Sequence, residues 1–233
     1  MQGGLQGGLL ARAHADAPGL PRGRNRLPGP AVLQAQRERI LRAAIASAAE
    51  LGYPAMTVAD VVRRARVSRT SFYAQFADRE DCFFAATAQG RRLMFGQISD
   101  AVHAVAGAEG AAEADDITVL RAGLRAYLRF LRDEPAFATV FYLELPAAGR
   151  RGGDRLADGQ AKLAARTAVW HGRARNGRHP DWPEVPAEVF RALTGATEEL
   201  VRAKVRAGRV DELPAIEDVI VGLHLRLLTA GSW

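Results

Sequence analysis

The chain has 233 residues, of which 48% are hydrophobic and 25% are charged. This composition is typical of a globular protein that is long enough to bury one large core or two small ones. The apolar runs are far too short to span a bilayer and no secretory signal opens the chain, so we expect a cytoplasmic protein without a membrane partner.

The net charge of +6 is distributed unevenly along the chain. Residues 1–30 carry four arginines and one aspartate, and residues 31–95 carry ten arginines and six acidic side chains. The remaining residues carry eighteen basic and nineteen acidic side chains, so that part is close to neutral. A basic half followed by a neutral half is the pattern expected of a nucleic-acid-binding region joined to a neutral body.

Residues 1–29 are rich in glycine, proline and arginine and show no hydrophobic period. This composition predicts a disordered, basic leader. The leader is either a solvated segment or an arm that contacts the phosphate backbone or the minor groove through Arg22, Arg24 and Arg26.

Residues 30–78 show the spacing of three helices. The first is predicted from about Ala31 to Leu51, where Gly52 ends it. Thr57 then precedes a short helix and has Asp60 three positions on, as in a capping box. Ser68 offers a second N-cap hydroxyl before another short helix. Two short capped helices joined by a turn of three to four residues form a helix-turn-helix unit.

The second helix of such a unit enters the major groove by its N-terminal turn. That turn carries Arg69, Thr70 and Ser71. An arginine can bond two acceptors of one guanine, and hydroxyls can bond donor or acceptor edges. We expect phosphate contacts from the phenol of Tyr73 and from Arg79, which orient the protein but read no sequence.

The stretch from the helix RERILRAAIASAAELGYPAMT to the triplet Arg79-Glu80-Asp81 resembles the DNA-binding domain of the tetracycline-repressor (TetR) family. About fifty residues carry the resemblance, and its most specific positions are Thr57, Val61, Ala65, Val67, Ser68, Phe72, Tyr73 and Phe76. The resemblance implies an all-α fold, with a helix-turn-helix domain over residues 30–78 and a helical ligand-binding and dimerisation domain over residues 79–233. It also implies that DNA is contacted by Thr57, Ser68, Arg69, Thr70, Ser71, Tyr73, Gln75 and Arg79.

Two positions depart from the family pattern. The family usually has glycine where this chain has Arg66, so the turn has to hold a side chain where a left-handed backbone is needed. The family often has histidine where this chain has Gln75, so a DNA contact there would be made by an amide.

Beyond the helix-turn-helix, the apolar spacing predicts further helices and no strand. A long helix is capped by Asp78 and runs to about Val105, and a flexible linker follows. An amphipathic helix then ends at Pro135, and a short apolar helix ends at Pro146 and a loop over residues 149–153. Later helices are expected at about 155–175, 187–207 and 215–229, with a loop over residues 176–186 and with Pro214 opening the last helix.

The last two helices carry apolar stripes that suit a four-helix interface with the same pair from a second subunit. The stripes consist of Val189, Leu193, Ala196, Leu200 and Val205, followed by Ile216, Val219, Ile220, Leu223 and Leu227. The alternative is that they only cover the core of the monomer. A homodimer is favoured because a single helix-turn-helix reads too few bases to find an operator.

The helical body is larger than DNA binding and dimerisation require, and the family resemblance implies a small-molecule pocket among its middle helices. The candidate lining residues are Met94, Tyr127, Phe130, Phe137, Phe141, Tyr142 and Trp170. Each of these residue types more commonly packs in a hydrophobic core than lines a ligand pocket.

No pattern indicates catalysis, a cofactor or a metal site. The five histidines are scattered without ligand spacing or companion cysteines, and no phosphate-binding loop or nucleophile elbow occurs. The single cysteine, Cys82, is predicted to be a small buried hydrophobe. The alternative is a thiol sensor, because a helix N-terminus lowers a thiol pKa.

These patterns predict a ligand-responsive, sequence-specific transcription regulator, and most readily a repressor that a small molecule releases from a palindromic DNA operator. Two alternatives remain. A helical protein could bind a small molecule and have lost sequence-specific DNA binding, and Arg66 is the residue that could spoil the turn. A helical enzyme with an incidental basic domain would need a convergent cluster of titratable groups.

Overall fold

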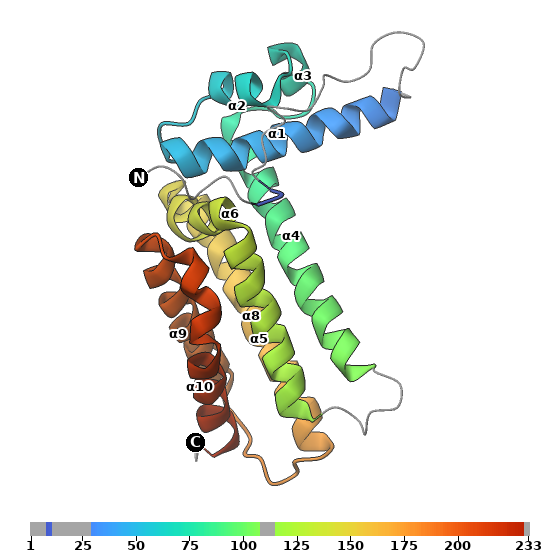
Figure 1. Ribbon diagram of the computed structural model, residues 1–233, viewed down its shortest axis with the longest axis vertical. Helices are drawn as coiled ribbons and strands as arrows, with labels where there is room; N and C mark the ends of the chain where they lie inside the picture. The colour runs from blue at the N-terminus through green and yellow to red at the C-terminus, as the bar shows by residue number, and fades with distance from the viewer. Residues whose placement is uncertain (1–7, 11–28, 108–114, 231–233) are drawn as a thin grey trace. The chain divides into compact units, whose positions relative to one another are not determined.

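The computed structural model describes residues 8–10, 29–107 and 115–230 (Figure 1). Within these ranges the chain forms helices joined by turns and contains no strand, so the predicted all-α fold is confirmed. No helix in the same ranges is long and apolar enough to cross a bilayer. The leader, apart from residues 8–10, and most of the predicted linker before residue 115 lie outside the described residues.

The described residues pack into two compact units. The first unit contains the residues up to Arg91 together with Asp133–Gly153, and the second contains Arg92–Arg132 and the residues from Asp154 onward. This division differs from the expected domains, because residues 133–153 pack with the helix-turn-helix although they lie far from it in sequence.

The first unit begins with α1 (Gly29–Leu51), α2 (Val58–Ala65), α3 (Arg69–Tyr73) and the first turns of α4 (Arg79–Ala106). Gly52 ends α1 at a φ of 79°, a left-handed conformation that suits glycine, as predicted. Asp78 caps α4 by accepting a hydrogen bond from the backbone nitrogen of Asp81 at 2.8 Å. The core between these helices is formed by Ile40, Ala44, Ile45, Val61, Ala65, Phe72, Phe76 and Phe83.

The second segment of this unit consists of α6 (Pro135–Thr139), the π-helix η1 (Val140–Glu144) and α7 (Leu145–Ala147), and α6 and η1 pack against α1. A carboxylate oxygen of Glu144 accepts a hydrogen bond from the backbone nitrogen of Tyr53 at 2.7 Å. This bond fixes the loop that joins α1 to α2 and therefore helps to position the helix-turn-helix.

The predicted loop over residues 149–153 is wrong, because α8 (Gly149–Asn176) already begins there. Gly149 turns the chain at a φ of 73°. Gly152 lies so close to the carbonyl of Leu145 that a β-carbon would stand 1.9 Å from its oxygen. The glycines therefore allow a sharp turn and close packing at a helix start, and they do not mark an irregular segment.

The second unit contains the rest of α4, α5 (Asp116–Asp133), most of α8, α9 (Ala187–Arg206), η2 (Val210–Ile216) and α10 (Glu217–Thr229). Trp170 and the buried residues Ala164, Phe190, Leu193 and Leu228 belong to its core. The last helix begins later than predicted, because Pro214 lies inside the 3₁₀ segment η2. Loop 177–186 lies between α8 and α9 as predicted.

The predicted stripe of α9 divides between two faces of that helix. Leu193 and Val205 are buried within the unit, whereas Ala196 and Leu200 are exposed. The same division occurs on α10, where Ile220 is fully buried and the side chain of Val219 is 60% exposed. Each helix therefore covers the core of the monomer with one face and leaves a smaller apolar face open.

Candidate DNA-binding surface and ligand cavity

The start of α2 has the predicted capping box. The hydroxyl of Thr57 accepts a hydrogen bond from the backbone nitrogen of Asp60 at 3.2 Å, and the Asp60 carboxylate accepts one from the backbone nitrogen of Thr57 at 3.1 Å. Hydrogen bonds donated to the Asp60 carboxylate, first by the Thr57 hydroxyl and then by Arg63, hold the pKa of Asp60 below its usual value. The hydroxyl also donates to Asp60 at 2.6 Å, so any DNA contact by Thr57 shares an oxygen already used by the cap.

The turn after α2 is held by Arg66, which adopts the left-handed conformation with φ 54° and ψ 46°. It is the only non-glycine residue with positive φ in the described ranges. The backbone nitrogens of Arg66 and Val67 donate to the carbonyls of Arg63 and Val62 at 3.3 and 3.2 Å. The turn therefore forms with a side chain where the family pattern has glycine.

The N-terminal turn of α3 is capped by Ser68, whose hydroxyl accepts a hydrogen bond from the backbone nitrogen of Ser71 at 3.0 Å. The two serine hydroxyls also lie 2.9 Å apart and bond each other. The side chains of Arg69 and Thr70 are exposed, and no hydrogen bond or ion pair joins them to another described residue. This turn therefore presents a guanidinium and a hydroxyl whose donors are available to an external partner.

The two aromatic residues of α3 differ in exposure. Phe72 is fully buried, whereas Tyr73 is 54% exposed and packs edge-on against Phe72 with ring centroids 5.3 Å apart. The Tyr73 ring is thus half packed. Gln75 is half-buried, and its amide nitrogen has no hydrogen-bond partner among the described residues.

Arg79 is the first residue of α4, and its guanidinium binds the loop that joins α1 to α2. Its Nη1 donates to the carbonyls of Tyr53, Pro54 and Met56 at 3.2, 3.1 and 2.7 Å. The guanidinium also lies over the Tyr53 ring, 4.7 Å from its centroid. Arg79 therefore fixes the approach to α2, and a phosphate contact by this residue would have to coexist with these bonds.

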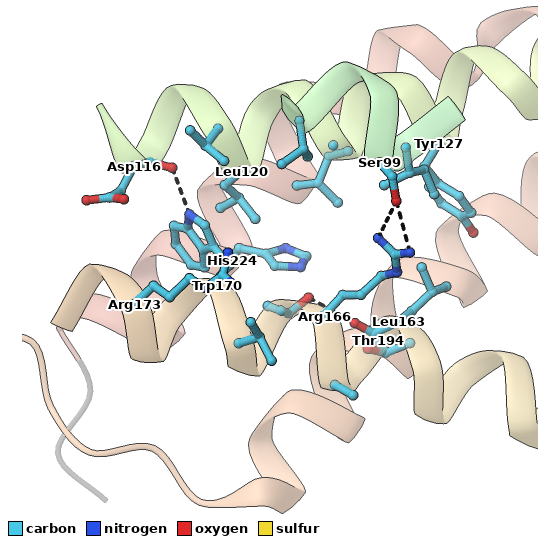
Figure 2. A pocket seen from close by; sticks show the side chains of 18 of the residues that line it. Ser99, Asp116, Leu120, Tyr127, Leu163, Arg166, Trp170, Arg173, Thr194 and His224 are labelled. Carbon is cyan, nitrogen blue, oxygen red and sulfur yellow. Dashed lines mark hydrogen bonds between the residues drawn. The ribbon is translucent and has the colours of Figure 1, made fainter. Parts of the chain in front are cut away.

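The second unit contains a cavity of about 590 Å³, a size that suits a drug-sized ligand. Its walls come from α4, α5, α8, α9 and α10 (Figure 2). Most of the wall is apolar, and the aliphatic lining residues are Ile98, Val102, Val119, Leu120, Leu124, Leu163 and Val169.

One side of the cavity is cationic and open to solvent. The exposed Arg166 donates two hydrogen bonds to the hydroxyl of Ser99, at 3.0 and 3.1 Å, and its guanidinium lies over the Phe95 ring. Arg173 and Arg178 also line the cavity and are exposed. Figure 2 shows the Arg166 side chain reaching toward Ser99 on the opposite wall.

The inner side of the cavity is polar and buried. It is lined by Thr194, Thr197 and Glu198 from α9 and by His224 from α10, each less than 10% exposed. Burial raises the pKa of Glu198 and lowers that of His224, because burial disfavours the charged form of either group.

Comparison with known families identifies the first unit. Residues 40–86 match the family model described as bacterial regulatory proteins of the tetR family. Over these residues the chain is similar to the tetR family. The matched segment contains the Thr57 cap, the Arg66 turn and the exposed start of α3, so the helix-turn-helix is similar to the N-terminal unit of these bacterial regulatory proteins.

Solved structures of bacterial regulators share the fold over most of the chain. The fatty acid degradation regulator FadR from Bacillus halodurans is 18% identical, with a TM-score of 0.69 over 86% of this chain and 97% of its own. FadR from Bacillus subtilis, solved with stearoyl-CoA, is 16% identical, with a TM-score of 0.69 over 84% and 98%. A tetR-family protein from Rhodococcus RHA1 is 19% identical, with a TM-score of 0.63 over 84% and 98%. No curated protein matches the chain by sequence.

The seven lining residues predicted for a TetR-family pocket fall in different places. Tyr127 and Trp170 line the cavity. Phe137, Phe141 and Tyr142 are instead core residues of the first unit, and the first two of these rings stack with centroids 5.5 Å apart. The remaining two, Met94 and Phe130, are buried in the second unit away from the cavity lining.

The sequence pattern did not predict the polar residues that line the cavity. Arg166 and Glu198 lie in helices whose charged side chains normally face solvent, so their residue types carried no signal. One local signal was available: Thr194, Thr197 and Glu198 follow Leu193 at helical spacing and continue its buried face.

Cys82 is buried, and burial raises the pKa of its thiol to about 12. A redox-sensing thiol needs the opposite shift and access to solvent. The packing therefore favours the small buried hydrophobe over the sensor. No cluster of His, Cys, Asp or Glu in the described part of the chain could hold a metal ion.

Proposed function

We propose that this TetR-family regulator is a homodimeric repressor that binds a palindromic operator and is released from it by a small molecule in the cavity of the second unit. The observation that supports this most directly is the start of α3. The side chains of Arg69 and Thr70 extend from a capped helix end and bond no described residue, as base reading requires.

The alternative of a protein that has lost sequence-specific DNA binding rested on Arg66. Since Arg66 adopts the left-handed conformation and the capped turn forms around it, that residue gives no reason to expect a damaged helix-turn-helix. The predicted DNA contacts of Thr57, Ser68, Ser71, Tyr73, Gln75 and Arg79 stay part of this proposal.

A second subunit would pack against the open faces of α9 and α10. Small or apolar exposed residues such as Ala192, Ala196, Leu200 and Val219 lie there, on the side of each helix that does not cover the core. Small side chains let two helix pairs approach closely, and a two-fold dimer matches the symmetry of a palindromic site.

The effector would act by differential affinity. A ligand that binds more tightly to the dimer state with misplaced recognition helices shifts the population away from DNA by that difference in free energy. The cavity has room for an organic ligand, and a neighbour of the same fold, FadR from Bacillus subtilis, was solved with stearoyl-CoA.

The proposal is tested by selecting binding sites for the full-length protein from random duplex DNA and following the affinity of the winners against salt. We expect an inverted repeat and a steep salt dependence. Arg69→Ala should weaken binding and relax the base preference at one position in each half-site, at a cost of about 1–3 kcal/mol. Arg129→Ala, an exposed arginine on α5, is the matched control and should leave base preference unchanged.

Tyr73→Phe removes only the phenolic hydroxyl and should weaken binding equally on all sequences, since a phosphate contact carries no sequence information. If no site is recovered above random, the proposal of a sequence-specific regulator is refuted. The result would favour a ligand-binding protein without sequence-specific DNA recognition. An intact base preference in Arg69→Ala would show that α3 does not read the bases through this residue.

A further inference from the structure

The inner wall of the cavity contains polar atoms that the protein leaves unpaired. Thr197 and Glu198 are consecutive residues of α9, only 6% and 1% exposed, and both line the cavity. The Thr197 hydroxyl and the Glu198 Oε1 atom are buried and have no hydrogen-bond partner among the described residues. Such atoms are uncommon in folded proteins because each costs free energy of desolvation, and a group retained at that cost needs an explanation.

The chemistry of these groups identifies what is missing. The second carboxylate oxygen of Glu198, Oε2, accepts a hydrogen bond from the Gln160 amide at 2.6 Å, so the carboxylate is held in place at one end. His224 lies 2.8 Å from the carbonyl of Ile220 through Nδ1. Because a carbonyl can only accept, Nδ1 carries the proton and Nε2 is left as an acceptor. Glu198 and His224 therefore both present acceptors, and the Thr197 hydroxyl can accept as well as donate, so acceptors outnumber donors on the inner wall.

Other lining residues have the reverse character. Arg166 and Arg173 are exposed and offer guanidinium donors, and much of the remaining lining is aliphatic. In Figure 2 the His224 imidazole points into the space bordered by Leu120, Trp170 and Arg166. A ligand that satisfies the whole cavity carries an anionic or acceptor group for the exposed arginines, an apolar body, and a donor for the buried inner wall.

We propose that the cavity binds an amphipathic organic molecule whose buried end carries a hydrogen-bond donor, a hydroxyl or an ammonium group, which bonds Thr197, Glu198 and His224. This inference rests on the proposed function, since it names the chemical class of the effector for the same cavity. A plain saturated chain would leave the carboxylate and the hydroxyl buried and unpaired. A donor on the ligand also offsets the desolvation that raises the pKa of Glu198.

The test uses three probes of equal length: dodecanoic acid, 12-hydroxydodecanoic acid and 12-aminododecanoic acid, with the 8-, 10- and 14-carbon homologues of each. Their affinities for the full-length protein are measured by calorimetry. We expect the hydroxy or the amino acid to bind on the order of tenfold more tightly than the unsubstituted acid of the same length, as a hydrogen bond to a charged group allows. The series that binds more tightly shows whether the cavity prefers a hydroxyl or an ammonium donor.

Two variants assign the preference to the inner wall. Thr197→Val and Glu198→Gln should each reduce the preference severalfold. Thr87→Val is the matched control, because Thr87 is likewise buried, its hydroxyl donates to the carbonyl of Phe84 at 3.1 Å, and it does not line the cavity. This variant should prefer the hydroxy or amino acid over the unsubstituted acid by the same factor as the wild type.

A stability measurement separates ligand recognition from a structural role. Thr197→Val removes an unpaired buried hydroxyl and keeps the shape, so the unfolding midpoint of the ligand-free protein should stay equal or rise. A lowered midpoint would mean that the hydroxyl supports the fold, and would overturn the inference. Equal affinities for the substituted and unsubstituted acids, or no binding by any probe, would also overturn it.

Operator selection and probe binding test the DNA-binding function and the ligand class separately. If the protein selects an operator but shows no preference for a donor-bearing probe, the ligand class is wrong and the DNA-binding regulator stands. If no operator is selected, the proposed function as a DNA-binding regulator is wrong, whatever the cavity binds.

Discussion

Replacing Arg66 with glycine should stabilise the DNA-binding unit. At φ 54° and ψ 46° the β-carbon of a non-glycine residue crowds its own backbone, at a cost of about 1–2 kcal/mol. Glycine relieves this strain but makes the unfolded chain more flexible. That flexibility lowers the free energy of unfolding by about 0.5–1 kcal/mol. Because the Arg66 side chain is exposed, little packing is lost. The midpoints of the two ranges leave a net gain of about 0.75 kcal/mol.

The matched control is Arg66→Ala, which removes the same charge but keeps the β-carbon and hence the strain. We expect the alanine variant to unfold at nearly the same urea concentration as the wild type and the glycine variant to unfold at a higher one, followed by circular dichroism. Native-state hydrogen exchange at the Val67 amide, which donates to the carbonyl of Val62, gives a local readout of the turn.

If the glycine and alanine variants were equally stable, the left-handed conformation would carry no measurable strain. Loss of stability in the glycine variant alone would mean that the flexibility of the unfolded chain outweighs the strain. Either result refutes the reasoning about the turn.

Three further outcomes are expected. Thr57→Ala should lower the free energy of unfolding by about 1 kcal/mol because the cap of α2 is lost, whereas Thr57→Ser should not, as urea titration would show. Burial lowers the pKa of His224 below its ordinary 6.5, so its contribution to stability is present above pH 6.5 and is lost as the pH falls below that value. His224→Asn, which keeps an N–H donor, should therefore lose less unfolding free energy between pH 7.5 and 5.5, and equal losses would contradict this. With a pKa of about 12, the thiol of Cys82 should react with an alkylating reagent at pH 8 only after unfolding, and rapid labelling of the native protein would contradict its burial.

The sequence by itself determined the features that depend on neighbouring residues. The capping box of Thr57, the N-cap of Ser68 and the glycine end of α1 each involve groups within a few residues of one another, so their spacing predicts them. The left-handed requirement at Arg66 is local for the same reason. The resemblance to the TetR family depended on this local pattern, and the family match covers the same stretch.

Only the tertiary structure decided which side chains meet across helices. Phe137 and Trp170 are equally plausible as lining residues in sequence, but one packs in the first unit and the other lines the cavity. Arg79 is a surface cation by its position, yet it binds three carbonyls that precede it by more than twenty residues. Glu198 is an ordinary helix-surface residue by type, and the packing of α9 buries it against the cavity. These outcomes depend on the contacts between distant segments, which helical spacing does not specify.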